Sequence, residues 1–392
     1  MFAHFLFFVI FCCTFSFISN LGYAFETNEG TPFNHAPDAP IIKKTMDLTS
    51  SLTVYKGHNL PRLRGAMISA NVSGPDLLEL GLKWNANLVR WQLNWIDKSA
   101  DKTDMQAYDK WLEKSLKMLD YLLPTLKKAS LMVVIDLHTP PGGMNKDNEQ
   151  MIFKEKKYQN KLLAVWKKIA LRYKSNDVIW GYDIVNEPIW REKISGLLDW
   201  QSLAELTAKN IREIDPDHAI IVQPGDWGNP NGFNDFKPLS TVGIVYSFHM
   251  YVPHTFTHQE IGVFKDVGLN YPGIINGRMW NKDQLRIALK PVVDFQKKYG
   301  VHIYVGEFSA IVWAPGNSTY NYLKDAIDIF EENGWDWSYH AFREWTGWSV
   351  EHHQDRKDAK PIKMQTDRQI LLETWFAKNE KPKFVPQNMQ KH

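Results

Sequence analysis

The chain has 392 residues, of which 44% are hydrophobic and 23% are charged, and its formal net charge is +2. A chain of this size can bury one large core or two ordinary ones, and it lacks the strongly basic balance of a nucleic-acid-binding domain, so we expect no nucleic-acid partner. Its 16 Trp, 15 Tyr and 21 Phe supply many flat apolar faces with a polar handle, which suit core packing and also the stacking of sugar rings.

The N-terminus resembles a secretory signal peptide. Residues 5–18 are almost all apolar, and Gly22 and Ala24 follow with the spacing of a signal-peptidase site. No Lys or Arg precedes the apolar run, and the alternative is an uncleaved anchor, although the run is short for a membrane span. We expect residues 1–24 to be removed after Ala24, giving a secreted or periplasmic protein with no membrane association. Both cysteines lie in this stretch, so the mature chain would hold no disulfide and no thiolate metal site.

A polar lead-in, residues 25–49, precedes a long region in which strand-like and helix-like segments alternate. Short apolar runs rich in β-branched or aromatic residues predict strands. In chain order these are Gly65–Val72, Ala86–Gln92, Leu131–His138, Val178–Val185, Ala219–Gln223, Val242–Tyr251, His302–Glu307 and Trp337–Arg343.

Helical periodicity fills most of the connections between these runs, and only the fifth connection is too short and too rich in Pro and Gly for a helix. The predicted helices are Leu112–Lys128, Asn160–Tyr173, Trp200–Ile214, Asp283–Tyr299, Tyr320–Glu332 and Arg368–Lys378.

Regular alternation of eight strands with helices predicts an α/β fold of parallel strands, a single-domain (β/α)8 TIM barrel spanning residues 50–378 and followed by a polar tail, residues 379–392. A doubly wound sheet is the structural alternative. The segment after the first strand, "ANVSGPD", has no glycine-rich phosphate loop, which disfavours the dinucleotide-binding form of that alternative.

Six of the predicted strands end in polar, ionisable or aromatic groups. In a barrel of this kind the active site lies at the carboxyl ends of the strands, so these groups should meet at one rim. They are Arg90, His138, the pair Asn186–Glu187, the pair His249 and Tyr251, Glu307, and Trp345 with Trp348.

Two glutamates stand across this rim from each other, Glu187 after strand four and Glu307 at strand seven. A carboxylate that closes an apolar run costs free energy unless it is paired or used. Two facing carboxyl groups are what glycoside hydrolysis requires, one as the proton donor and the other as nucleophile or base. Their spacing cannot be read from the sequence, so retention and inversion both remain open at this point.

With these motifs in order, the sequence resembles glycoside hydrolase family 5, within a large clan of retaining (β/α)8 glycosidases. "YDIVNEP" is similar to the acid/base motif, "IYVGEFSA" to the nucleophile motif and "LRGAMISA" to the start of the first strand, and the resemblance covers roughly residues 50–378.

The resemblance implies a role for each matching residue. Glu187 would be the general acid/base and Glu307 the nucleophile, and the substrate-binding residues would be Arg90, His138, Asn186, His249, Tyr251 and Trp345, the last as a stacking platform for which Trp348 also competes. It also implies retention of configuration, and a β-1,4-linked polysaccharide or oligosaccharide as substrate. The expected enzyme is an endo-β-1,4-glucanase, or alternatively a β-mannanase, xyloglucanase or exo-β-glucanase. A non-catalytic carbohydrate-binding barrel is disfavoured because both glutamates are present.

Further tryptophans near the rim, Trp91, Trp95, Trp227, Trp280 and Trp313, are candidates for additional sugar subsites or for core packing. The histidine pairs of the chain lack an HExxH pattern, so we expect no metal and no cofactor. We expect a monomer.

The segment "GYDIVNEP" raises a geometric requirement. Adjacent strand residues point to opposite faces, so Asn186 and Glu187 can serve one site only if the backbone is distorted at residues 185–187. A retaining enzyme would also place the carboxyls of Glu187 and Glu307 about 5–5.5 Å apart.

Overall fold

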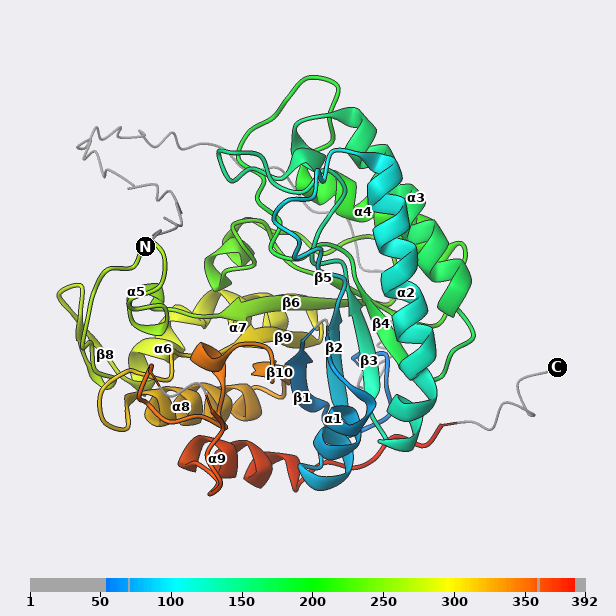
Figure 1. Ribbon diagram of the computed structural model, residues 1–392. Helices are drawn as coiled ribbons and strands as arrows, with labels where there is room; N and C mark the ends of the chain where they lie inside the picture. Colours follow the sequence, from blue (N-terminus) through cyan, green and yellow to red (C-terminus); the bar gives the residue numbers. More distant parts are fainter. Residues whose placement is uncertain (1–53, 70, 358–359, 385–392) are drawn as a thin grey trace, which may run out of the picture.

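The computed structural model describes residues 54–69, 71–357 and 360–384, so the expected signal peptide and lead-in lie outside the described residues. Eight parallel strands close into a barrel with helices around it (Figure 1), which confirms the predicted (β/α)8 fold. Each strand pairs with its neighbours along the chain, and the last barrel strand closes on the first. The barrel strands are β1 (Arg64–Ile68), β2 (Leu88–Gln92), β3 (Met132–Asp136), β4 (Ile179–Asp183), β5 (Ala219–Val222), β6 (Ile244–Met250), β9 (Ile303–Phe308) and β10 (Asp336–Phe342).

The barrel interior changes from apolar to polar along the strands. The part of the interior near the beginnings of the strands holds an apolar cluster, which is separate from the core between the strands and the helices. Side chains repeat every two residues along a strand, so the next inward position after Leu88 is Arg90, and Asp136 follows Val134 in the same way. The barrel therefore carries a polar layer directly above its apolar floor. The buried members of the floor are Leu63, Leu88, Val134, Trp180, Ala219, Ile221, Val245 and Tyr304.

The main helices lie outside the barrel and bury one face each. In α2, for example, buried Tyr108, Leu112, Leu116 and Leu119 recur every three or four residues, and the side chain of Asp104 caps the first turn. The helices are α1 (Gly74–Leu78, continuing into a π-helical turn, Glu79–Lys83), α2 (Met105–Lys128), α3 (Lys156–Tyr173), α4 (Trp200–Arg212), α5 (His254–Thr257), α6 (Lys282–Ala288), α7 (Lys290–Tyr299), α8 (Ser318–Glu332) and α9 (Asp367–Phe376).

Of two predictions about the helices, the structure corrects the first and confirms the second. The segment Asp283–Tyr299, predicted as one helix, is two helices, because Pro291 lies in the first turn of α7 and cannot continue the hydrogen-bond ladder of α6. The fifth connection contains only a short 3-10 helix, Pro230–Asn234, as its Pro/Gly-rich sequence predicts.

The long connection after β6 contains a hairpin that the strand pattern did not predict. Strands β7 (Gly273–Ile275) and β8 (Arg278–Trp280) pair antiparallel around Asn276–Gly277, and both turn residues have positive φ. An Asn-Gly pair is the sequence signal for such a turn. Ile275 and Trp280 are buried against the core, so Trp280 is a packing residue and not a rim residue.

The start of the predicted tail is attached to the N-terminal end of the barrel. The amide of Asn379 donates to the carbonyls of Arg64 and Asn85, and Lys381 Nζ donates to those of Gly81 and Ala86. The folded unit therefore extends past residue 378. Over the described ranges, no helix combines the length and apolarity needed to cross a membrane.

Candidate active site

The polar residues at the carboxyl ends of the strands surround a cleft of about 940 Å³. The structure brings together all but one of the site residues predicted from the sequence. Arg90 lies fully buried beneath the cleft. The others that line it are His138, Asn186, Glu187, His249, Tyr251 and Glu307.

Arg90 is the hub of the site. Its Nη1 lies 2.5 Å from Glu307 Oε1, and its Nη2 lies 2.9 Å from Asp183 Oδ2, 3.0 Å from Asp136 Oδ1 and 2.9 Å from Asn186 Oδ1. A guanidinium is suited to this task because its planar fork presents five N–H donors in fixed directions. Three buried acids and one amide are thereby held in fixed positions by one cation.

Glu307 is held by both carboxylate oxygens. Besides Arg90 on Oε1, Tyr251 donates its hydroxyl to Oε2 at 2.9 Å, and His340 Nδ1 lies 3.2 Å from the same oxygen. Burial alone would raise the pKa of Glu307, but the neighbouring His249, His340 and Arg90 outweigh it and hold that pKa well below its ordinary value. Glu307 is therefore an ionised carboxylate in a fixed orientation.

Glu187 faces Glu307 from a distorted backbone. Its φ is +44°, a left-handed conformation that non-glycine residues rarely adopt, so the distortion expected at residues 185–187 lies at Glu187 itself. The Glu187 N–H donates to Gln223 Oε1 at 3.1 Å, and His249 Nδ1 lies 2.9 Å from Glu187 Oε1. One oxygen of Glu187 and one of Glu307 lie within 4.8 Å of each other. The Glu187 side chain is 26% exposed and reaches the cleft.

His138 and Asn186 form a polar wall beside the glutamates. His138 Nδ1 lies 2.8 Å from Asp136 Oδ2, and its Nε2 lies 3.5 Å from the Asn186 amide nitrogen. Burial would lower the pKa of His138, but the Asp136 carboxylate outweighs it and raises that pKa. Asn186 is oriented by Arg90 on its oxygen and by His138 on its nitrogen, so the second N–H of its NH2 group is the part left to bind another molecule.

Comparisons with known proteins identify the family of this chain. The model of the family described as cellulase (glycosyl hydrolase family 5) matches residues 56–351. The chain belongs to glycosyl hydrolase family 5. It is thus a cellulase-like glycoside hydrolase, as the sequence resemblance predicts.

Two curated relatives and one solved structure illustrate the similarity of this family 5 enzyme to known proteins. Endoglucanase C of Acetivibrio thermocellus is 27% identical over 255 residues, 58% of this chain and 73% of the relative. Cellodextrinase A of Ruminococcus flavefaciens is 26% identical over 315 residues, 76% of this chain and 88% of the relative. The solved structure of Thermotoga maritima Cel5A in complex with cellobiose has a TM-score of 0.61 at 21% identity, and covers 80% of this chain and 96% of its own. At that identity the structural match establishes the fold.

Trp345 is the predicted site residue that the family 5 cleft does not include. Trp348 lines the cleft instead, with its ring 5.9 Å from that of Tyr251. The chain turns at Arg343, which has φ +53°, and the following Trp345 is 42% exposed and packs against Trp313. Among the other rim tryptophans, Trp227 lines the cleft.

Several site residues escaped the sequence reasoning. Asp136 and Asp183 are fully buried on Arg90, and the available signal was an acid inside an apolar strand, which requires a buried cation. Gln223 holds both the Glu187 N–H and Asp183. His340, in β10, contacts Glu307 directly. The sequence pattern favours the tryptophans that follow His340 as the site residues of this strand.

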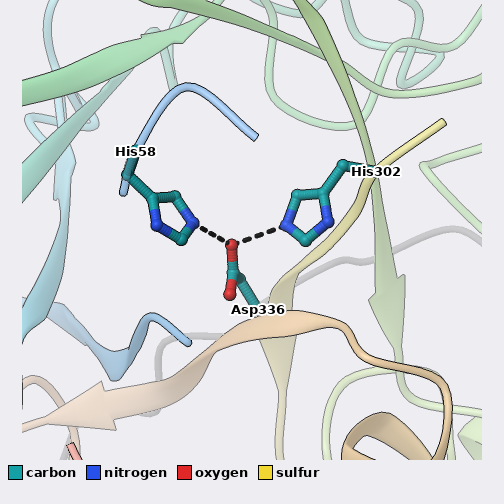
Figure 2. A group of neighbouring side chains, drawn as sticks. All are labelled: His58, His302 and Asp336. Atoms are coloured by element: carbon teal, nitrogen blue, oxygen red, sulfur yellow. Dashed lines mark hydrogen bonds and ion pairs between the residues drawn. The ribbon is translucent and has the colours of Figure 1, made fainter. Parts of the chain in front are cut away.

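A cluster of two histidines and one aspartate, residue types that can bind metal ions, lies at the end of the barrel opposite the cleft. Figure 2 shows the imidazoles of His58 and His302 directed at one oxygen of Asp336, with Nε2···Oδ2 distances of 2.7 and 2.6 Å. His58 Nδ1 accepts the Leu60 N–H at 3.2 Å, so its Nε2 carries the proton and cannot coordinate an ion. Asp336 Oδ1 accepts the Leu63 N–H at 2.8 Å.

This group is therefore a hydrogen-bonded anchor. It ties the segment that enters β1 to the first residue of β10 and to the residue just before β9. Burial would raise the pKa of Asp336, but His302 and His58 outweigh it and lower that pKa.

Proposed function

We propose that this enzyme cleaves β-1,4-linked glucan with retention of configuration, with Glu187 as general acid/base and Glu307 as nucleophile. The observation that carries the proposal is the facing pair of glutamates, whose nearest oxygens lie within 4.8 Å. Glu307 is buried and held ionised by His249, His340 and Arg90, and Glu187 reaches the cleft beside His249. Retaining glycosidases use a carboxyl separation of about 5–5.5 Å.

The first chemical step follows from this arrangement. Glu187 gives its proton to the glycosidic oxygen while an oxygen of Glu307 attacks the anomeric carbon, so the glycosidic bond breaks as the glycosyl–Glu307 ester forms. Arg90 and Tyr251 keep Glu307 deprotonated and aimed before the substrate arrives, which lowers the reorganisation that the step requires.

In the second step Glu187, now a carboxylate, takes a proton from water, and the water oxygen attacks the anomeric carbon and releases Glu307. The NH2 group of Asn186, oriented by Arg90, is placed to donate to a sugar hydroxyl next to the reacting carbon. His138 and Trp348 bind the same sugar from the walls of the cleft.

The names of the relatives support β-glucan as the substrate class, since they include endoglucanases and a cellodextrinase. We also propose that the protein is exported, that its catalytic domain begins near residue 50, and that it is a monomer. The decisive test is the release of reducing ends from carboxymethylcellulose, barley β-glucan, mannan and xyloglucan, measured side by side. We expect the β-glucans to be the best substrates. Activity on mannan alone, or on xyloglucan alone, would replace the proposed specificity with one of its neighbours.

The stereochemistry is a separate prediction. The first product from a cello-oligosaccharide should be the β-anomer, because two displacements at one carbon restore the starting configuration. Proton NMR of the anomeric signals during the first minutes checks this. An α-anomer formed first would mean that a water molecule fits between the carboxyls, at a separation of about 6.5–9.5 Å.

A further inference from the structure

His340 lies in direct contact with Glu307, and the proposed reaction leaves it without a role. It lies in β10, where the family resemblance predicts an aromatic stacking platform on the eighth strand. Its imidazole lies between two acids, with Nδ1 3.2 Å from Glu307 Oε2 and Nε2 3.3 Å from Glu344 Oε2. The second contact is an ion pair without hydrogen-bond alignment. Both His340 and Glu344 line the cleft.

A count of protons gives the charge of His340. Tyr251 has one hydroxyl proton, and it donates that proton to Glu307. The Tyr251 oxygen is also in short contact with His340 Nδ1, so in this contact the imidazole must be the donor. Nε2 lies 3.3 Å from the Glu344 carboxylate, where a lone pair on the nitrogen would be repelled and a proton is favoured. With a proton on both nitrogens, His340 is an imidazolium.

The surroundings agree with this charge. Burial would lower the pKa of His340, but the carboxylates of Glu307 and Glu344 outweigh it and raise that pKa to about 10. The remaining neighbours are the Trp348 ring, 5.8 Å away, and His258. Burial, His254 and His340 together lower the pKa of His258 to about 3, so it carries no charge at neutral pH.

The surroundings of Glu344 complete the set. Burial would raise the pKa of Glu344, but His340 outweighs it, helped by His138 and by the side chain of Gln92, and that pKa is lowered. Glu344 is thus an ionised partner that sits on the far side of the imidazole from Glu307.

We propose that His340 and Glu344 form a positioning pair for Glu307, in which the imidazolium fixes Oε2 and supplies a second counter-charge, and Glu344 keeps His340 protonated. The proposal rests on the proposed role of Glu307 as nucleophile. A sugar in this cleft then meets a charged, hydrogen-bonding wall at the end of β10 in place of an aromatic face.

The test compares His340→Gln, which keeps an N–H donor but loses the charge, with His340→Lys, which keeps the charge. Loss of a cation within 4 Å should raise the pKa of Glu307, so the acid limb of the kcat/KM profile should move up by about one pH unit in His340→Gln. Because Glu307 would no longer be held in its orientation, His340→Gln should also lower kcat/KM at the optimum pH by roughly ten- to hundredfold. His340→Lys should keep its acid limb within a few tenths of a unit of the wild type. His254→Gln replaces an uncharged cleft histidine and is the matched control, with no shift in the acid limb.

A second measurement follows the imidazole without relying on activity. NMR of histidine-labelled enzyme should show His340 protonated from pH 5 to 9, whereas in Glu344→Gln its titration should move down into that range. The proposal is overturned if His340 titrates near its ordinary value of about 6.5 in the wild type, or if His340→Gln leaves the acid limb unchanged. Wild-type hydrolysis by Glu307→Gln would instead remove the proposed function, so the two failures can be told apart.

Discussion

Replacement of Glu307 by Gln should abolish glucan hydrolysis, and replacement of Glu187 by Gln should slow it by about 10²- to 10⁴-fold. The first loss is the larger, on the order of 10⁴- to 10⁶-fold, because no covalent intermediate can form without the nucleophile. Gln keeps the shape of Glu, so both changes leave the packing of the mouth in place. The measurement is kcat/KM on barley β-glucan, with a thermal unfolding curve for each variant to establish folding.

An activated aryl cellobioside separates the two roles. A dinitrophenolate leaves without help from an acid, so Glu187→Gln should still form the glycosyl–enzyme and release one burst of phenolate. Azide should then speed its turnover, because azide needs no general base, and the product should be the β-glycosyl azide. Glu307→Gln should show no burst and no such rescue.

Glu113→Gln is the matched control for both variants. Glu113 lies on α2 and pairs with Lys168 and Arg172 on α3, away from the cleft, so its activity should match the wild type. Equal behaviour of Glu187→Gln and Glu307→Gln on the activated substrate would contradict the assignment of separate roles.

The sequence was sufficient to predict the barrel and most of its mouth, for a physical reason. Parallel strands expose their carboxyl ends at one rim, so a polar residue that closes an apolar run must lie there. His249 and Tyr251 lie at the mouth because each continues the inward face of its strand. Glu307 is out of step with the inward-facing Tyr304, and it reaches the mouth because the register between β6 and β9 shifts beside it. The sequence also predicts that Glu187 lies at the mouth, because Pro188 ends the strand directly after it. In the structure the left-handed backbone of Glu187 turns its side chain toward the cleft.

The rest of the site depends on geometry that periodicity does not carry. Trp345 and Trp348 fit the sequence pattern equally well. Only the structure distinguishes them, since Trp348 lines the cleft and Trp345 packs beside it against Trp313 and Trp348. His340 lies within the predicted strand, where nothing in the pattern distinguishes it from a packing residue. Asp183 lies in the middle of an apolar run, and its burial is explained only by the position of Arg90 in the folded protein.

Replacement of Arg90 by Met should destabilise the fold by about 3–5 kcal/mol and remove most activity, because it leaves Asp136, Asp183 and Glu307 buried without their shared cation. Arg90→Lys should be nearly as harmful, since one ammonium cannot reach partners that a planar fork holds in different directions. Urea unfolding and kcat/KM measure the two effects.

Arg343→Met is the control, because Arg343 also contacts three carboxylates, at 2.5 Å (Asp76), 2.9 Å (Glu79) and 2.8 Å (Glu351). Its side chain is 31% exposed, and water screens such a network, so its loss should cost no more than about 1 kcal/mol. Equal destabilisation by the two substitutions would mean that burial of the Arg90 cluster has no energetic weight.

The pH dependence of the Arg90→Met variant gives the sharper test. Burial raises the pKa of Asp183 to about 6 even though Arg90 lowers it, whereas an unfolded Asp titrates near 3.9. A folded pKa above the unfolded one adds stability that is present at low pH and lost as pH rises through the folded value. Without Arg90 the folded pKa of Asp183 rises further and that of Glu307 rises from its lowered value, so the deficit of Arg90→Met should be larger at pH 8 than at pH 5. A deficit that is constant over this range would show that the lost interaction is packing and not charge.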